Sequence, residues 1–284
     1  MPEAPRSVGD LVESSTLVLA RAGLVDARRE ALRVWAGVER GRIADAIVGR
    51  DEQVAATRSE RFDTAIRRRA AGEPLAYVTG STGFRRLMLR CDRRALIPRP
   101  ETEGLVEAAL ARVRTGVAAD IGTGSGAIAL ALRDEGDFDQ VLAMDVSADA
   151  VALAAENAAV TGLAIDLRQG ELTAPLAGQR VNLLVSNPPY LTQAEYDTLD
   201  RSVRDYEPEL SLVGGPDGQL LIRRLFQEGL AAVAPMGWIA MEVDCNRAAD
   251  SGRIATGLGW QETTVLNDLF GRARYVLARR GSGG

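Results

Sequence analysis

From about residue 102 onward the chain alternates short apolar runs with segments of helical periodicity, and this alternation strongly limits its possible folds. Strands that alternate with helices form a doubly wound, mostly parallel sheet with helices on both faces. The predicted strands are residues 117–121, 141–145, 164–167, 181–185, 237–243, 261–266 and 273–278, the last two as a closing pair. The predicted helices are residues 102–114, a helix from about 126, and residues 148–160, 219–233 and 247–257. We therefore expect an α/β fold.

The residues before this region have a different organisation. Between about residues 7 and 72, apolar side chains recur at helical spacing and glycines separate the segments, which predicts short helices. The predicted domains are a helical N-terminal domain over residues 1–72, a β-hairpin linker over residues 73–100 and an α/β domain over residues 101–284.

Local patterns predict the structure of the linker. Residues 77–80 and 84–89 have the composition of strands, and we expect them to pair as the hairpin. Pro100 stands where a helix can begin, because Glu101 and Glu103 in its first turn complement the helix dipole.

Charge is unevenly distributed along the chain. Residues 1–100 contain 19 arginines and 13 acidic residues, a net charge of +6, and the remaining residues carry a net charge of −11. A basic N-terminal part suggests a macromolecular partner, although a solvated helical surface explains the same charge.

No run approaches the roughly 18 apolar residues of a membrane span. Residues 1–10 lack a signal-peptide pattern and the two cysteines are far apart, so we expect a reduced, cytoplasmic location.

Two residue types are missing from the sequence, and their absence excludes several kinds of chemistry. There is no histidine, and all 34 basic residues are arginine. Without histidine there is no Ser-His or Cys-His nucleophile pair and no histidine-ligated metal. Without lysine there is no Schiff base and no Walker A phosphate site. The chemistry must therefore use carboxylates, amides, hydroxyls, backbone groups or a cofactor with its own reactivity.

A glycine-rich loop, Gly122-Thr123-Gly124-Ser125-Gly126, follows the first strand of the α/β region and opens a helix. Glycines let the backbone turn tightly and approach a ligand, and ligands bind at the carboxyl ends of strands in such sheets. Asp145 ends the next strand, where an acid can accept hydrogen bonds from both ribose hydroxyls. A helix N-cap is the alternative role, but Ser147 is better placed for it. The loop and Asp145 together predict a nucleoside-type cofactor.

The segment Asn187-Pro188-Pro189-Tyr190 lies at the tip of the predicted strand 181–185. Pro188 has no N–H and favours an extended backbone at Asn187, so the tip holds an amide and an aromatic ring in fixed positions. Such a tip can bind a flat nitrogen-bearing group, such as an amide or a base amino group. The same residues are also common in turns that end strands. Because the topology places the tip beside the glycine loop, a binding site is favoured.

The glycine loop, the ribose acid and this tip resemble the class I S-adenosylmethionine-dependent methyltransferases that modify planar nitrogens. The segments Leu96–Glu103, Tyr206–Leu210 and Gly215–Gly218 resemble, more narrowly, the protein-(glutamine-N(5)) methyltransferases that act on peptide chain release factors. The resemblance extends from about residue 72 to the C-terminus. It implies a Rossmann-like, seven-stranded, mostly parallel sheet, with S-adenosyl-L-methionine as cofactor and S-adenosyl-L-homocysteine as product. In that family a small helical N-terminal domain binds the partner, a class 1 peptide chain release factor.

The resemblance also implies roles for individual residues. Residues Gly122–Gly126 and Asp145 would hold the cofactor. Asn187 would contact both the cofactor and the substrate glutamine, while Pro188, Pro189 and Tyr190 would complete the substrate site.

Two segments depart from the family pattern. Glu171 and Leu172 stand where the family often has an acidic residue followed by an aromatic one. Glu171 can accept a hydrogen bond from the adenine amino group, but Leu172 lacks an aromatic ring to stack on adenine. The family pattern Glu-x-Gly after the sixth strand is here Glu242-Val243-Asp244, to which the sequence assigns no function.

We predict methyl transfer to the side-chain amide nitrogen of the glutamine in the Gly-Gly-Gln motif of release factors. The Asn187 side-chain oxygen and the Pro188 carbonyl are each expected to accept one N–H of the substrate, with Tyr190 packed on the flat amide. The protein then contributes positioning and electrostatics, without a metal.

Three alternatives remain open from the sequence. They are a glutamine methyltransferase of a large-subunit ribosomal protein, a nucleic-acid adenine methyltransferase with Tyr190 stacked on a flipped base, and a silent cofactor- or release-factor-binding module. The acidic α/β region argues against the nucleic-acid enzyme, and Asn187 with the full glycine loop argues against the silent module. We expect a monomer with no membrane association and no sequence-specific contact with nucleic acid.

Overall fold

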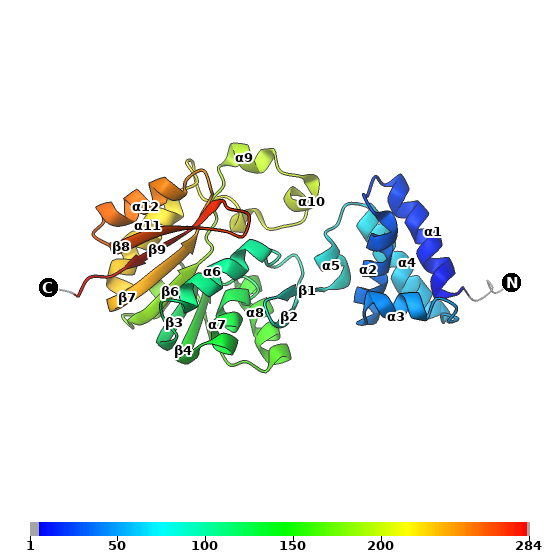
Figure 1. Ribbon diagram of the computed structural model, residues 1–284, viewed down its shortest axis with the longest axis horizontal. Helices are drawn as coiled ribbons and strands as arrows, with labels where there is room; N and C mark the ends of the chain where they lie inside the picture. Colours follow the sequence, from blue (N-terminus) through cyan, green and yellow to red (C-terminus); the bar gives the residue numbers. More distant parts are fainter. Residues whose placement is uncertain (1–5, 283–284) are drawn as a thin grey trace. The chain divides into compact units, whose positions relative to one another are not determined.

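The computed structural model describes residues 6–282, which form two compact units (Figure 1). The first unit contains the described residues up to Ser81 and, in addition, Arg201–Tyr206. The second unit contains Thr82–Asp200 and the described residues from Glu207 onward. Between residues 6 and 282, no helix is both long and apolar enough to cross a membrane.

The first unit is helical, as the periodicity of its sequence predicts. Its N-terminal helices are α1 (Val8–Arg21), α2 (Ala27–Glu39), α3 (Ile43–Val48), α4 (Ala56–Ala70) and α5 (Leu75–Thr79), and α10 (Arg201–Arg204) belongs to the same unit. Ser7 begins α1 with a capping box, in which its side chain and that of Asp10 each accept a hydrogen bond from the other's backbone N–H. Trp35 and Phe62 pack edge to face in the core, with ring centroids 5.1 Å apart.

The linker differs from its prediction in both of the strands that were expected to pair. Residues 77–80, predicted as a strand, lie in α5 and at its C-terminal Gly80, which adopts a φ of 73°. The N–H groups of Tyr77 and Val78 both donate to the Pro74 carbonyl, which closes a helical turn. A short apolar run fits a strand or a buried helical turn equally well, so its periodicity does not discriminate. The hairpin is formed by β1 (Ser81–Phe84) and β2 (Leu87–Arg90). Its turn lies at residues 85–86, where Arg85 has a φ of 50°, so the single strand predicted over residues 84–89 was wrong.

The second unit is built around a seven-stranded sheet of order β5-β4-β3-β6-β7-β9-β8. Strand β9 runs antiparallel to β7 and β8, and the other pairs are parallel, which confirms the predicted Rossmann-like α/β fold. Its strands are β3 (Thr115–Ile121), β4 (Asp137–Asp145), β5 (Asp166–Gln169), β6 (Val181–Ser186), β7 (Val233–Glu242), β8 (Gln261–Asn267) and β9 (Ala273–Arg279). Its helices are α6 (Pro100–Leu110), α7 (Ala127–Glu135), α8 (Ala148–Thr161), η1 (Ala174–Leu176), α9 (Gln193–Asp197), η2 (Glu209–Ser211), α11 (Leu220–Ala232) and α12 (Ala248–Gly257).

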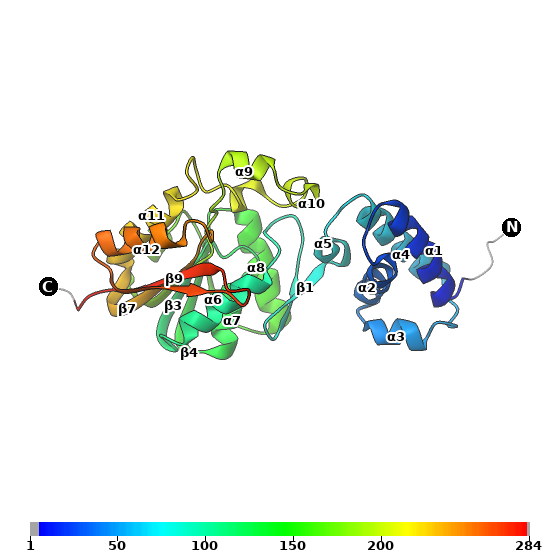
Figure 2. The ribbon, with the colours of Figure 1, turned by 45° about the horizontal axis from the view of Figure 1, so that its top comes forward.

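Helices cover both faces of this sheet, with α6, α7 and α8 on one face and α11 and α12 on the other (Figures 1 and 2). Side chains of β6 alternate between the two cores: Leu183 and Val185 pack with α6 and α7, and Leu184 packs with α11. Burial on both faces explains the continuous apolar character of the strand sequences. The predicted start of α6 is confirmed, since Pro100 is its first residue and Glu101 and Glu103 occupy its first turn.

The order of the sheet positions the site. The chain leaves β3 for β4 on one side and later returns to β6 on the other side. A crevice forms at the carboxyl ends of strands where the winding direction reverses in this way, and ligands bind there. The glycine loop follows β3, Asp145 ends β4, and Asn187 follows β6.

Leu142→Ala should destabilise the second unit by about 2–5 kcal/mol, because Leu142 is fully buried in a central strand and its truncation leaves a cavity. The measurement is urea denaturation in a Trp35→Phe background, where fluorescence comes from Trp238 and Trp260 of the second unit. Val160→Ala, at a side chain 53% exposed on α8, is the control and should change the unfolding free energy by less than about 0.5 kcal/mol. Equal effects of the two substitutions would contradict the described packing.

Candidate active site

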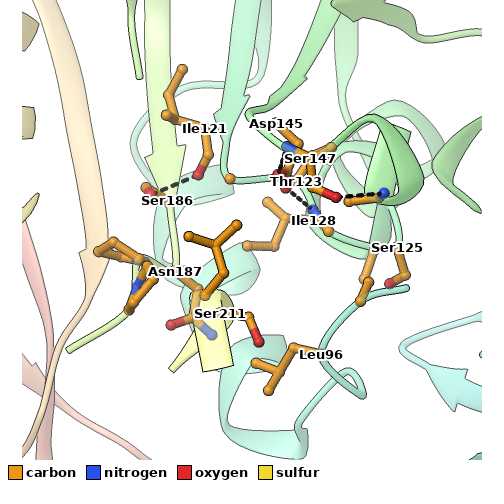
Figure 3. A pocket seen from close by; sticks show the side chains of 18 of the residues that line it. Leu96, Ile121, Thr123, Ser125, Ile128, Asp145, Ser147, Ser186, Asn187 and Ser211 are labelled. Carbon is orange, nitrogen blue, oxygen red and sulfur yellow. Dashed lines mark hydrogen bonds between the residues drawn. The ribbon is translucent and has the colours of Figure 1, made fainter. Parts of the chain in front are cut away.

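A cavity of about 330 Å³ opens in the second unit at the carboxyl ends of β3, β4 and β6 (Figure 3). Its wall combines the glycine loop, the strand ends, the link at residues 94–99 and the segment 208–211. The sequence-predicted residues that line it are Gly122, Thr123, Gly124, Ser125, Asp145, Glu171, Leu172, Asn187, Pro188 and Pro189. Asn187 lies across the cavity from Thr123 and Asp145.

The glycine loop adopts backbone angles that favour glycine. Gly122, Gly124 and Gly126 have φ values of 73°, 54° and 84°. The N–H groups of Gly122 and Thr123 donate to the Met144 carbonyl at 2.8 and 2.9 Å, which ties the loop to the end of β4. Gly126 does not line the cavity and begins α7, where a Cβ would lie 3.2 Å from the Ala154 Cβ. Gly126 therefore permits close packing of the loop on α8.

Asp145 is held by backbone donors beside the cavity. Its Oδ2 accepts from the Gly124 N–H and its Oδ1 from the Ser147 N–H, both at 2.9 Å. A carboxylate has about four acceptor positions, so lone pairs remain for the two hydroxyls of a ribose. Ser147 caps α8 by accepting from the Ala150 N–H, as its position in the sequence predicts.

Two buried side chains that the sequence reasoning missed support the glycine loop from below. Asp120 accepts from the Thr123 hydroxyl at 2.6 Å and from the Ala129 N–H at 3.1 Å, and burial raises the pKa of Asp120 to about 7. Asn157 donates to the Ser125 carbonyl at 2.8 Å from the buried face of α8. The sequence signal for Asn157 is a lone amide in an otherwise alanine-rich helix, and that signal is weak.

The part of the cavity wall at residues 171–172, which the family resemblance links to adenine, is largely apolar. Leu172, Leu221 and Leu225 line it, and Leu172 adopts a left-handed φ of 46°, which is uncommon for a bulky residue. Glu171 lines the same end, but it is exposed and forms an ion pair with Arg224. A planar ring can pack on aliphatic side chains without an aromatic partner, so the wall suits an adenine.

The wall near the link depends on Glu207, which the sequence reasoning did not single out. Glu207 is 4% exposed, accepts from the Ile97 N–H at 3.1 Å and pairs with the Arg99 guanidinium. It therefore joins two segments of the cavity wall that lie 110 residues apart in the chain. Its sequence signal is the segment Tyr206–Leu210.

The tip of β6 is anchored on both sides. The Ser186 hydroxyl donates to the Ile121 carbonyl at 2.7 Å, which ties the end of β6 to β3. The Asn187 Nδ2 donates to the Thr102 Oγ1 at 3.1 Å, and Thr102 in turn donates to Glu242 Oε2 at 2.8 Å. Asn187 thus lines the cavity with its amide held from the side of α6.

Tyr190 occupies a different place from the other residues of the tip. Its ring packs against the core beneath α11 and α12, and it is not among the residues that line the cavity. Its hydroxyl lies 3.5 Å from Glu242 Oε1, and burial raises the pKa of Tyr190. A contact between Tyr190 and a substrate amide therefore stays a prediction.

The fold is that of the class I S-adenosylmethionine-dependent methyltransferases, and the glycine loop, Asp145 and Asn187 line one cavity at the carboxyl edge of its sheet. A methyltransferase structure from Pyrococcus furiosus has the same fold, with a TM-score of 0.53 and 19% identity over 69% of this chain and 89% of that one.

Comparison with known proteins narrows the class to a family. The methyltransferase small domain family matches residues 101–222, and the PrmC N-terminal domain family matches residues 10–80. The chain is 40% identical to the release factor glutamine methyltransferase of Deinococcus radiodurans, over 96% of this chain and 99% of that protein. It is 37% identical to the enzyme of the same name from Cereibacter sphaeroides, over 95% and 97%. The chain belongs to the release factor glutamine methyltransferase family, which confirms the predicted enzyme class.

Glu242→Gln should change how stability depends on pH. Burial raises the pKa of Glu242 to about 7 from its ordinary 4.5, so folding favours the protonated form. The stabilisation is complete below pH 4.5 and is lost as the pH rises through 7, a change of about 3 kcal/mol. The glutamine variant lacks this loss, so its unfolding free energy should increase relative to wild type between pH 5 and pH 8. Urea denaturation at both values tests this.

Glu107→Gln is the matched control for this experiment, because Glu107 is an exposed glutamate on α6 of the same unit. The difference in unfolding free energy between Glu107→Gln and wild type should be the same at both pH values. If the difference in unfolding free energy between Glu242→Gln and wild type were also the same at both pH values, Glu242 would not be a buried group of raised pKa.

Proposed function

We propose that this chain transfers a methyl group from S-adenosyl-L-methionine to the side-chain amide nitrogen of the glutamine in the Gly-Gly-Gln motif of class 1 peptide chain release factors. The observation that most strongly supports the proposal is the shared cavity. The Asn187 tip lines one side of it, and the glycine loop and Asp145 line the opposite side. The names of the full-length relatives support the choice of a release factor glutamine as substrate.

The residues of the cavity fit the cofactor. The glycine loop would pass close to it, Asp145 would accept hydrogen bonds from the ribose hydroxyls, and the wall at Leu172 would pack on the adenine. Glu171 would accept from the adenine amino group, in competition with its ion pair to Arg224. When bound, S-adenosylmethionine supplies a methyl group activated by its sulfonium.

The tip would orient the substrate. A glutamine amide nitrogen is a weak nucleophile because its lone pair is delocalised into the carbonyl. Asn187 Oδ1 and the Pro188 carbonyl would each accept a hydrogen bond from one N–H of the substrate amide. These two bonds would fix the position of the nitrogen and increase its electron density. Pro189 and Tyr190 would complete the substrate site. Positioning of this kind lowers a barrier without any group that titrates near neutral pH, in agreement with a chain that lacks histidine.

The partner would bind through the N-terminal part of the chain. We assign residues 1–72 to a helical partner-binding domain, residues 73–100 to the hairpin linker and residues 101–284 to the catalytic domain. The match of residues 10–80 to the PrmC N-terminal domain family supports a separate N-terminal module. We expect the protein to act as a cytoplasmic monomer on a protein substrate, without sequence-specific contact with nucleic acid.

Mass spectrometry of candidate substrates tests this function. Purified enzyme and S-adenosylmethionine are incubated in parallel with a release factor, with large-subunit ribosomal proteins and with RNA. We expect one added methyl group on the release factor glutamine that is flanked by glycines. Methylation of the ribosomal protein or RNA alone, or of none of the three with cofactor binding intact, would overturn the proposal.

Asn187→Ala should lower kcat for release factor methylation by about 10²–10³-fold, the loss typical when one preorganised hydrogen-bonding group is removed from an active site. Cofactor affinity, measured by calorimetry, should stay within about twofold, because most of the cofactor wall remains. Asn246→Ala, at an exposed asparagine after β7, is the control and should retain wild-type kcat. A wild-type kcat for Asn187→Ala would show that the tip does not orient the substrate.

Asp145→Ala should weaken cofactor binding by at least about tenfold, because it removes a charged acceptor of two ribose hydrogen bonds. Isothermal calorimetry with S-adenosyl-L-homocysteine measures the dissociation constant without turnover. Asp149→Ala, at an exposed acid in the first turn of α8, is the matched control. Equal affinity of the two variants would exclude Asp145 as a ribose ligand.

A further inference from the structure

Two buried polar side chains at the base of the site have no role in the function proposed above. Thr102, in the first turn of α6, is 5% exposed, and Glu242, at the end of β7, is 1% exposed. They are 140 residues apart in the chain and hydrogen-bonded at 2.8 Å. Thr102 also contacts Asn187, the residue assigned to the substrate. A buried, hydrogen-bonded carboxylate beside the active site therefore reaches Asn187 through one hydroxyl.

The number of protons on these groups determines which of them donates and which accepts in each hydrogen bond. The Thr102 hydroxyl donates its single proton to Glu242 Oε2 at 2.8 Å, and at a pH above the raised pKa of Glu242, about 7, the ionised carboxylate can only accept this bond. Thr102 can then only accept a hydrogen bond from Asn187. The NH2 group of the Asn187 amide, and not its oxygen, must therefore face Thr102. The Nδ2-to-Oγ1 bond of 3.1 Å is the result, and Oδ1 is left for another partner.

The orientation of the Asn187 amide decides whether the site can bind a glutamine NH2 group. The two ends of an amide are almost identical in shape, so packing alone does not distinguish them. With Oδ1 toward the substrate, Asn187 accepts a substrate N–H. With Nδ2 toward the substrate, two donor groups would face each other and the bond would be lost.

Each oxygen of Glu242 faces a hydroxyl group, Oε2 that of Thr102 and Oε1 that of Tyr190. The Tyr190 hydroxyl lies 3.5 Å from Oε1 and is a second group with a proton to donate. Burial raises the pKa of Glu242, and Glu101 on α6 acts in the same direction, whereas the hydrogen bond from Thr102 and the charge of Arg274 on β9 favour the ionised form. Tyr190 thereby belongs to the same network, behind the tip.

We infer that Thr102 and Glu242 are positioning residues, which together orient the Asn187 amide so that its oxygen faces the substrate nitrogen. This inference rests on the function proposed above, because it concerns the same substrate contact. It adds two residues from α6 and β7 to the site.

Thr102→Val tests the inference, because valine has the shape of threonine and lacks the hydroxyl. We expect kcat/KM for the release factor to fall at least about tenfold, the cost of leaving a buried polar group without its partner, while cofactor affinity is unchanged. Thr102→Ser keeps the hydroxyl and should recover most of the activity. Thr198→Val removes an exposed hydroxyl outside the cavity and serves as the control. A wild-type kcat/KM for Thr102→Val would overturn the inference.

A second readout does not depend on activity. In 15N NMR spectra, the Asn187 side-chain NH2 should exchange slowly with solvent in wild type and in Thr102→Ser, and rapidly in Thr102→Val. Glu242→Gln can present either a donor or an acceptor to Thr102, so it should lower kcat/KM severalfold and give faster exchange than wild type. If Thr102→Val does not fold, Glu242→Gln carries the same test. Unchanged exchange in the folded variants would overturn the inference.

The two hypotheses fail in different ways. If wild-type enzyme methylates no release factor, the proposed function is wrong, and the exchange measurement still decides how the Asn187 amide is held. If wild type is active, Asn187→Ala is inactive and Thr102→Val matches wild type, then only the positioning role is wrong.

Discussion

The parallel pairing of β3 with β4 on one side and β6 on the other is the constraint on which the site depends. Ile121 pairs with Met144 of β4 and with Ser186 of β6, so the three strands end at the same level. The residues that follow these ends are the glycine loop, Asp145 and Asn187. A slip in either register would separate the glycine loop and Asp145 from the tip, and the bond from Ser186 to the Ile121 carbonyl opposes such a slip.

Buried carboxylates hold this edge together at a cost in stability. Asp120 lies beneath the glycine loop and Glu242 lies beneath the tip, and burial raises the pKa of each to about 7. The ionised form of each carboxylate is therefore less stable in the folded protein than in water. Natural proteins commonly keep such destabilising groups where function needs them. Glu242 is the clearer case, since its hydrogen bonds lead directly to Asn187.

The sequence alone predicted those parts of the site that depend on chain order and strand topology. Apolar runs indicated β3, β4 and β6, and parallel strands bring their carboxyl ends together, so the placement of Asp145 and the Asn187 tip around one cavity followed. The contacts of Thr102, Glu207 and Glu242 were not predicted, because the partners lie 85 to 140 residues apart in the chain and no local pattern specifies such contacts. The strand predicted at residues 77–80 was wrong because a short apolar run has too few residues to show a period.

The sequence motif that begins α6 acquires a structural meaning from these contacts. The helix starts at Pro100, whose fixed φ suits the first helical position, and this start places Thr102 in the first turn, where its hydroxyl can reach Asn187. Arg99, just before the helix, is held by Glu207, which also binds the Ile97 N–H. The short segment Ile97–Thr102 thus joins the wall of the cavity to Asn187. Pro100 sets the start of the helix, Arg99 pairs with Glu207 and Thr102 contacts Asn187, so each of these three residues acts on the geometry of the site.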